Sequence, residues 1–301
     1  MKRYITARRG STRGAARMTA KTTPADVSVP PRDIHFDVAA AGSGHWLGGD
    51  PVGTAVFNAM SLTFPDGERM FIDAVRHYRG EVGGKLAEDV KGFIAQEAIH
   101  SREHHQLNQL IDRTRYLVGE IEAAIRERIA FSRSRGPMRM LIATIALEHF
   151  TAMMAEAHAR HRNLFENVDP GIERMWRWHA VEETEHKAIA YDVFMHATRN
   201  WAPWKRYFRR TLAMALITYF FTRNITHYAA RLLEADGYSY KDAAKAVKTY
   251  VWRTPGLFSR NAKTYFAWYR PGFHPWDQDN RALVAEWKAE FDADIAAPAT
   301  A

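Results

Sequence analysis

The stretch FIAQEAIHSREHHQL, residues 93–107, decides the fold together with IERMWRWHAVEETEHKAIA, residues 172–190. Both stretches carry apolar residues three or four positions apart, a spacing that places side chains on one face of an α-helix. In both, a Glu-x-x-His pair interrupts the apolar face. The pairs are Glu97 with His100 and Glu183 with His186. The pattern predicts two helices whose buried faces hold carboxylate and imidazole groups.

Two further apolar stripes each contain a single glutamate, Glu68 within residues 64–78 and Glu148 within residues 141–159. A buried carboxylate without a partner is costly, so carboxylates converging from several helices require a compensating cation. Carboxylates and imidazoles together suit iron. We therefore expect two iron ions, with manganese as the alternative metal. A buried network of ion pairs without metal is the other explanation that this pattern leaves open.

The order of these residues predicts the fold. A lone glutamate on the first and third helices and Glu-x-x-His on the second and fourth is the ligand order of ferritin-like dimetal bundles. We therefore predict an all-α protein: a ferritin-like four-helix bundle with a crossover helix and additional C-terminal helices. The crossover is expected within residues 111–137, and the C-terminal helices at about 203–234, 239–252 and 279–292.

Pro65 and Asp66 are typical of a helix start, so the first bundle helix is predicted to begin there. Glu68 would then lie near the first turn, where its alternative role is to favour the helix dipole. NVDPG at 167–171 predicts the tight link into the fourth helix, which continues to about Ala197.

Two histidines extend the ligand pattern. His179 lies one turn before Glu183 on the same helical face, and we expect it to add a third imidazole; a supporting or core role is its alternative. His104 continues the stripe one turn beyond His100, and we expect it to support the site or line a cavity. The predicted metal ligands are Glu68, Glu97, His100, Glu148, His179, Glu183 and His186.

Small and acidic neighbours complete the candidate site. Ala152 and Ala155 lie beside the expected ligands and would leave a cavity for oxygen and substrate, or allow close helix packing. Glu182 and Glu185 fall off the buried face, so we expect them to be solvated or to serve packing.

Charge and composition set the domain limits. The chain of 301 residues has a net charge of +8, and residues 1–30 alone contain seven Lys or Arg and one acid. That segment lacks the apolar run of a secretory signal, and no nucleic-acid-binding module accompanies it. We expect a disordered basic tail at 1–31, one helical dimetal-binding domain at 32–292 and a disordered tail at 293–301. No nucleic-acid partner is expected.

The absence of cysteine excludes disulfides, iron–sulfur clusters and a cysteine nucleophile, and fits a cytoplasmic protein. The apolar run LAMALITYFF, residues 212–221, is too short to span a bilayer. It predicts a helix packed on the bundle; its alternative is an interfacial helix, which would associate the protein peripherally with a membrane. A homodimer is the default expectation for assembly.

Five segments resemble the bacterial family named as predicted metal-dependent hydrolases. The resemblance spans residues 33–290 and rests on FPDGERMF, FIAQEAIHSREHHQLN, ALEHFTAMMAE, WHAVEETEHKAIAYDVF and RPGFHPWD. His179, Glu183 and His186 also form a His-x-x-x-Glu-x-x-His pattern that is similar to the di-iron arylamine N-oxygenases, whose sites have four Glu and three His. This second resemblance implies that Glu68, Glu97, His100 and Glu148 complete the set.

Three functions are compatible with such a site. The first is a non-haem di-iron oxygenase or oxidase that activates O2 to oxidise an apolar or aromatic small molecule, with N-oxygenation as its sharpest form and an unidentified electron donor as partner. The alternative is a dimetal-dependent hydrolase that directs a metal-bound water at an ester or amide. Iron storage is the third, and the long aromatic C-terminal half argues against it.

Overall fold

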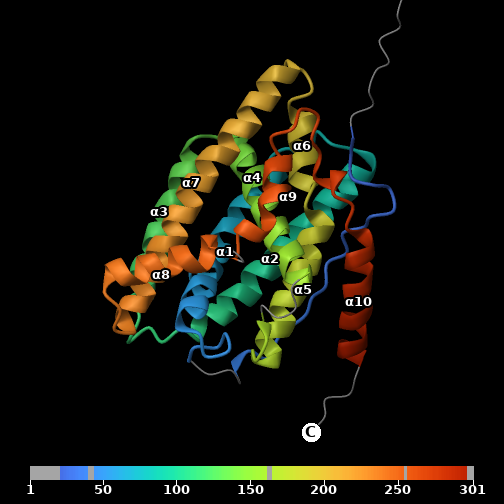
Figure 1. Cartoon of the computed structure of the whole chain (residues 1–301). Coiled ribbons are helices and arrows are strands. Elements are labelled where there is room, and N and C mark those ends of the chain that lie inside the picture. Colours follow the sequence, from blue (N-terminus) through green and yellow to red (C-terminus); the bar gives the residue numbers. More distant parts are fainter. Residues whose placement is uncertain (1–20, 40–43, 161–164, 254–255, 297–301) are drawn as a thin grey trace, which may run out of the picture.

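The computed structural model describes residues 21–39, 44–160, 165–253 and 256–296. Two helix pairs form the centre of the bundle (Figure 1): α1 (Pro51–Arg76) packs along α2 (Gly84–Gln109), and α4 (Pro137–Arg160) packs along α5 (Pro170–His186). Because α1 also contacts α4 and α2 contacts α5, the four helices share one core.

The other helices surround this core. α3 (Val118–Ser134) connects α2 to α4 and packs against α1, as expected of the predicted crossover segment. In Figure 1, α7 lies along one side of the core and α10 stands on the opposite side, beside α5. The C-terminal elements are α6 (Ile189–Ala197), α7 (Pro203–Ala235), α8 (Tyr240–Trp252), α9 (Ala262–Ala267), α10 (Arg281–Ala296) and two 3-10 turns, Ser259–Asn261 and Pro275–Asp277. The all-α prediction is confirmed.

α1 begins at Pro51, 14 residues before its predicted start at Pro65. Asp50 caps the helix by accepting from the Val52 amide at 2.9 Å, and Pro51 occupies the first turn. Pro65 therefore lies inside α1, where its missing N–H leaves the Ser61 carbonyl without a helical donor. Asn108 of α2 donates to that carbonyl at 3.0 Å. The predicted start at Pro65 was wrong because a neighbouring helix satisfies the break.

The predicted fourth helix is two helices. α5 ends at His186 and α6 begins at Ile189. At the break, the buried Lys187 ammonium group donates to the Gln278 carbonyl at 2.8 Å and to Asn280 at 2.7 Å. Contacts with the C-terminal segment thus accompany the break directly after His186.

The N-terminal segment lies against the bundle from Lys21 onward. A Cβ atom on Gly92 would come within 2.1 Å of the Val29 carbonyl oxygen, and one on Gly171 within 2.0 Å of the Asp37 oxygen. Glycine is needed at both positions because the segment passes directly over α2 and α5. The packed region begins before the predicted boundary at residue 32, and α10 extends past the predicted boundary at 292. Residues 1–20 and 297–301 lie outside the described residues.

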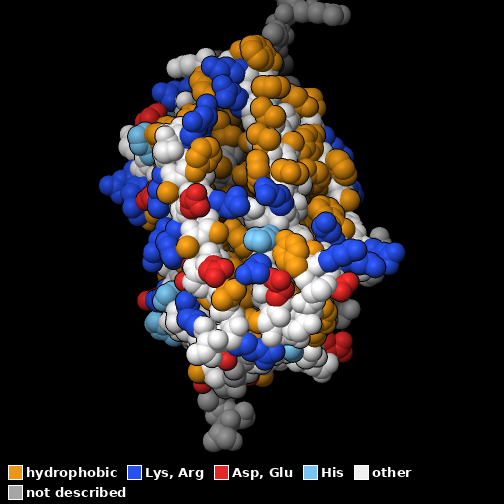
Figure 2. Space-filling view, turned by 90° about the vertical axis from the view of Figure 1, so that its left-hand side faces the viewer, with side chains coloured by type: hydrophobic (Ala, Val, Ile, Leu, Met, Phe, Trp, Pro, Cys, Tyr) orange, Lys and Arg blue, Asp and Glu red, His pale blue; other side chains and the backbone are white. Residues whose placement is uncertain are grey.

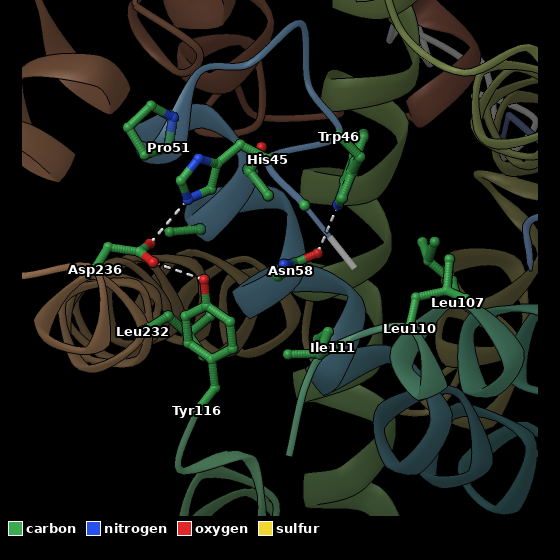
Figure 3. A pocket seen from close by; sticks show the side chains of 13 residues that line it. His45, Trp46, Pro51, Asn58, Leu107, Leu110, Ile111, Tyr116, Leu232 and Asp236 are labelled. Atoms are coloured by element: carbon green, nitrogen blue, oxygen red, sulfur yellow. Dashed lines mark hydrogen bonds and ion pairs between the residues drawn. The ribbon is translucent and has the colours of Figure 1, made fainter. Parts of the chain in front are cut away.

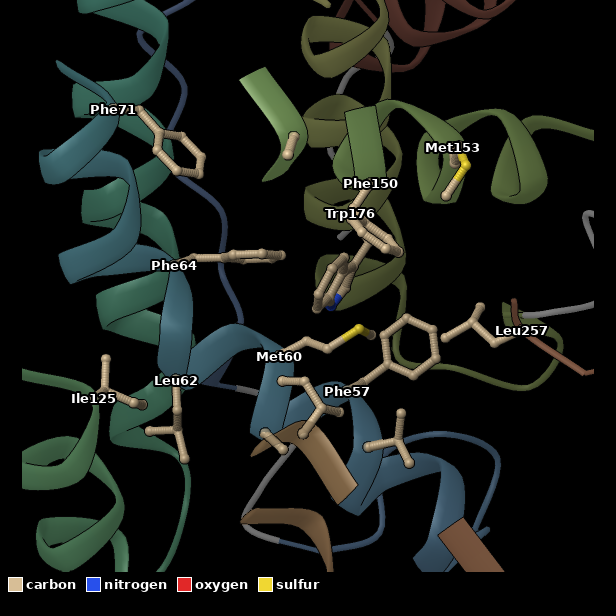
Figure 4. Packing of buried hydrophobic residues seen from close by; sticks show 14 of the residues in the cluster. Phe57, Met60, Leu62, Phe64, Phe71, Ile125, Phe150, Met153, Trp176 and Leu257 are labelled. Carbon is tan, nitrogen blue, oxygen red and sulfur yellow. The ribbon is translucent and has the colours of Figure 1, made fainter. Parts of the chain in front are cut away.

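Large apolar side chains fill the space between α1 and α5. Figure 4 shows Phe57, Met60 and Phe64 of α1 converging with Trp176 of α5. The Phe57 and Trp176 rings meet edge to face at 5.2 Å. Among the described helices, the segment Pro137–His158 of α4 is long and apolar enough to cross a membrane, but over half of that window is buried inside the protein.

A separate hollow lies near the end of α7 (Figure 3). Asp236 accepts from the Tyr116 hydroxyl at 2.7 Å and pairs with His45 at 3.1 Å, while the Trp46 indole donates to Asn58 at 2.8 Å. The two Asp236 bonds tie the loops before α1 and α3 to the end of α7, and the Trp46 bond ties the first of these loops to α1. The hollow holds only about 20 Å³, which is too small for a substrate.

Candidate metal centre

The bundle brings all seven predicted ligands into one buried cluster. α1 contributes Glu68, α4 contributes Glu148, and α2 and α5 contribute the rest; no member is more than 4% exposed. On α2 and α5 the ligands follow the three- and four-residue steps of the apolar stripes, which explains why one face of each helix delivers them.

The carboxylates of this cluster have too few partners. Both oxygens of Glu68, Glu97 and Glu148 are buried without a hydrogen bond, as is Oε2 of Glu183. Burial raises the pKa values of Glu68, Glu97 and Glu148 well above 4.5, and neighbouring carboxylates add to each shift. Burial would also raise the pKa of Glu183, but His186 and His179 hold it well below the ordinary value. Such orphaned acceptors need a proton or a cation.

His186 presents its Nε2 atom to the carboxylates. The Gln96 amide group donates to the Pro30 carbonyl at 3.0 Å and to Glu185 at 3.1 Å, so its oxygen faces His186 Nδ1 at 3.0 Å and must accept from it. Nε2 then points at Glu97 Oε1, 3.2 Å away. A ring nitrogen directed at a carboxylate is the arrangement expected of a metal ligand.

His100 is oriented in the same way through its other nitrogen. Its Nε2 lies 3.0 Å from Glu182 Oε2, and Glu182 also accepts from Arg32 at 2.9 Å, so Nε2–H is the donor. Nδ1 is left without a hydrogen bond, 3.7 Å from Glu183 Oε1. Burial lowers the pKa of His100 well below 6.5, which keeps this nitrogen free of a proton.

His179 is fixed by a chain of hydrogen bonds that begins at the proline break of α1. Because Asn108 Nδ2 donates to the Ser61 carbonyl, its Oδ1 accepts from Ser61 Oγ at 2.7 Å. Ser61 Oγ must then accept from His104 Nδ1 at 2.9 Å, and His104 Nε2 must accept from His179 Nδ1 at 2.6 Å. This points His179 Nε2 at Glu183 Oε1, 2.9 Å away.

The donor atoms form groups of the size that a metal ion needs. Two groups share no residue: Glu97, Glu148 and His186 in one, His100, His179 and Glu183 in the other, each with donor atoms within 4.8 Å of one another. Glu68 falls within that distance of members of both groups. The donors therefore fit two cations. His104 also lies within reach, but both of its nitrogens are already hydrogen bonded.

Some predicted roles change. Glu182 and Glu185 were expected to be solvated or to serve packing, yet they are at most 2% exposed and hold His100 and Gln96 in place. Ala155 lines a hollow of about 40 Å³ beside His179 and Glu183, whereas Ala152 is buried outside it. Sequence analysis missed Gln96, whose only signal was its place one residue before a ligand.

A larger cavity of about 580 Å³ reaches the cluster from the surface. Its walls come from α1, α3, α4 and α7 and are mostly apolar, and its inner end contacts Glu68 and Glu183. Aromatic rings also lie beside the imidazoles: Trp178 meets His100 at 4.8 Å, and Phe93 meets His186 at 5.0 Å. Among the described residues, the cluster is thus enclosed by aromatic side chains, and an apolar cavity leads to it.

Fold and site together define an all-α bundle built to bind metal. The family model described as predicted metal-dependent hydrolase matches residues 30–279. The chain belongs to this family. No curated protein and no solved structure matches it.

The family supports a metal-dependent enzyme and favours the hydrolase alternative over the predicted oxidoreductase. The ferritin-like classification, the likeness to N-oxygenases and the identity of the metal as iron stay predictions. The assignment of the seven residues as ligands, the O2 and electron-donor partners and the homodimer also stay predictions.

Proposed function

We propose that this protein is a dimetal-dependent hydrolase that acts on an apolar ester or amide. The observation that carries the proposal is the pair of separate three-residue donor groups, joined by Glu68, at the inner end of an apolar cavity. The family favours hydrolysis as the reaction.

Some residues of the chain would hold the metals, and others would line the cavity through which substrate enters. Two bound cations would supply a water of lowered pKa and polarise a carbonyl oxygen. Glu97, Glu148 and His186 would hold one cation, and the group with His100 and His179 the other. Glu68 and Glu183 lie where the cavity meets the cluster, so substrate would arrive on their side.

The cavity sets the class of substrate. Its walls include Phe64, Leu147 and Phe150, and a volume of about 580 Å³ is within the range of sites for small organic molecules. Displacing water from such walls favours apolar groups, roughly 25 cal/mol for each Å² of apolar surface buried. We therefore expect esters with long acyl or aromatic groups to be better substrates than acetates.

The test compares hydrolysis with oxygen chemistry in the purified protein. Loaded with zinc or manganese under argon, the protein should bind about two metal ions per chain and hydrolyse p-nitrophenyl esters. Glu97→Ala and His186→Ala should lose metal and activity while circular dichroism shows the helices retained. Glu88→Ala is the matched control, because Glu88 lies on the same helix with a 70% exposed side chain.

Oxygen activation is the second candidate, because four carboxylates and three imidazoles in a dry site suit a pair of iron ions. Absence of hydrolysis under argon, together with oxygen uptake and a transient visible absorption band from the ferrous protein, would overturn the hydrolase proposal. Hydrolysis under argon with zinc would overturn the oxygenase.

A further inference from the structure

One face of α7 is apolar and uncovered in this structure. Trp204, Phe208, Leu212, Leu216 and Phe220 recur every four residues, and each is between 43% and 71% exposed. Figure 2 shows hydrophobic side chains gathered over the upper part of this side of the molecule, bordered by Lys and Arg. Apolar patches of this kind mark sites of interaction with other molecules.

The charges of α7 are positive except for Glu234 near its C-terminal end. Residues 203–233 contain six Lys or Arg and no Asp or Glu. Of these, Arg209 and Arg223 are exposed, and Lys205 lies over the Trp201 ring at 4.4 Å. A helix with aromatic residues on one side and cations beside them has the composition of helices that lie in the interface of an anionic membrane.

The apolar face of α7 continues into the cavity that leads to the metal centre. Phe220, which belongs to the exposed face, also lines this cavity, together with Ile217 of the same helix. Across the opening, Phe131 of α3 is 66% exposed and lines the cavity as well. An apolar molecule could therefore pass from a bilayer to Glu68 and Glu183 without crossing water.

We propose that α7 docks the protein on anionic membranes and that its substrate enters from the lipid phase. A second copy of the chain fits the face less well, because two such helices would bring their cations together without acids to pair them. The lipid substrate rests on the proposed hydrolase function, whereas the docking does not.

Co-sedimentation of the full chain with vesicles tests the docking. The protein should bind phosphatidylcholine vesicles that contain phosphatidylserine, bind pure phosphatidylcholine vesicles weakly, and be released by salt. The double variant Trp204→Ser with Phe208→Ser should lose about tenfold or more in partitioning, because it removes two interfacial rings. Arg209→Glu with Arg223→Glu should lose binding only to the anionic vesicles.

The control is Leu117→Ser, an exposed apolar position beside Tyr116 at the far end of α7, which should leave binding unchanged. Sedimentation without vesicles shows whether a second copy of the chain covers this face instead of a membrane. If wild type is a dimer that does not bind vesicles, and Trp204→Ser with Phe208→Ser converts it to a monomer, the proposal is overturned in favour of a second copy. Equal binding by all variants would also overturn it. Hydrolysis of a soluble ester should survive in the α7 variants, so failed docking leaves the hydrolase proposal intact.

Discussion

Two groups of buried glutamates lie side by side in this protein, and only one of them is paired by the protein itself. Glu182 and Glu185 accept hydrogen bonds from Arg32, and Glu185 also pairs with Lys288 at 2.5 Å. Glu68, Glu97 and Glu148 are as deeply buried and have no hydrogen bond to either oxygen. The first group is complete without a ligand, whereas the second lacks its counter-charge.

The pKa values follow the same division only in part, because burial raises the pKa of Glu182 to about 8 although Arg32 acts in the opposite direction. Arg32 and Lys288 keep the pKa of Glu185 below its ordinary value even though burial acts in the opposite direction. The pKa of Glu97 rises well above 4.5 because burial and its carboxylate neighbours act together. The comparison teaches that depth of burial alone does not distinguish the two groups of glutamates; hydrogen bonds from Arg32 do.

Removing the Arg32 guanidinium, the cation that pairs with Glu182 and Glu185, should have the largest effect on stability. Arg32→Met leaves Glu182 and Glu185 buried beside each other and should lower the free energy of unfolding by about 3 kcal/mol, with or without metal. Denaturant unfolding measures this. Lys91→Met, which breaks an exposed pair with Glu88, should cost less than about 0.5 kcal/mol. Equal losses of unfolding free energy in Arg32→Met and Lys91→Met would show that the buried ion pairs contribute no more to stability than the exposed pair.

The second prediction is that Glu97→Gln has opposite effects on the stability of the metal-free and the metal-loaded protein. Glu97→Gln removes one orphaned charge, and the new amide can donate to the Nε2 of His186, 3.2 Å from the present Glu97 oxygen. The metal-free protein should gain about 1 kcal/mol in stability, while the metal-loaded protein should lose stability and bound metal. Thermal unfolding with and without a chelator would show it. A metal-free variant less stable than wild type would contradict the unpaired state of this group.

A pH series probes the same groups. The raised pKa values of Glu68, Glu97 and Glu148 mean that their contribution to metal-free stability is present below pH 4.5 and is lost as pH rises through the folded-state values. Metal replaces those protons, so the free energy by which metal stabilises the fold should grow from pH 6 to pH 8, by up to about 1.4 kcal/mol per pH unit for each proton displaced, and the increase in Tm on adding metal should grow with it. An increase independent of pH would show that the carboxylates bind no metal.

The smallest effect is expected at the hydrogen-bond chain that begins at Pro65. Ser61→Ala removes the link between Asn108 and His104, at a cost of about 1 kcal/mol in stability. Metal affinity should fall about 10- to 100-fold, because His179 loses its fixed orientation. Titration calorimetry measures this, with the exposed Ser134→Ala as control. Unchanged affinity would leave the chain a purely structural role.

Much of the site could be predicted from the sequence because helical spacing is local. The steps from Glu97 to His100 and from His179 to Glu183 and His186 fix a shared face in any helix. The same reasoning failed at Pro65, which is a helix start by propensity and an interior position in the structure. It also failed at the end of α5, where a distant segment meets Lys187.

The sequence by itself determined the all-α class and the shared helical face of His179, Glu183 and His186, since 3.6 residues per turn is a property of the backbone. Only the tertiary structure decided which nitrogen of each histidine faces the cluster and which glutamates have a protein cation. Arg32 and Glu182 are 150 residues apart in the chain, and Gln96 and His186 are 90 apart. Hydrogen bonds over such separations depend on how the helices pack, and no local pattern encodes them.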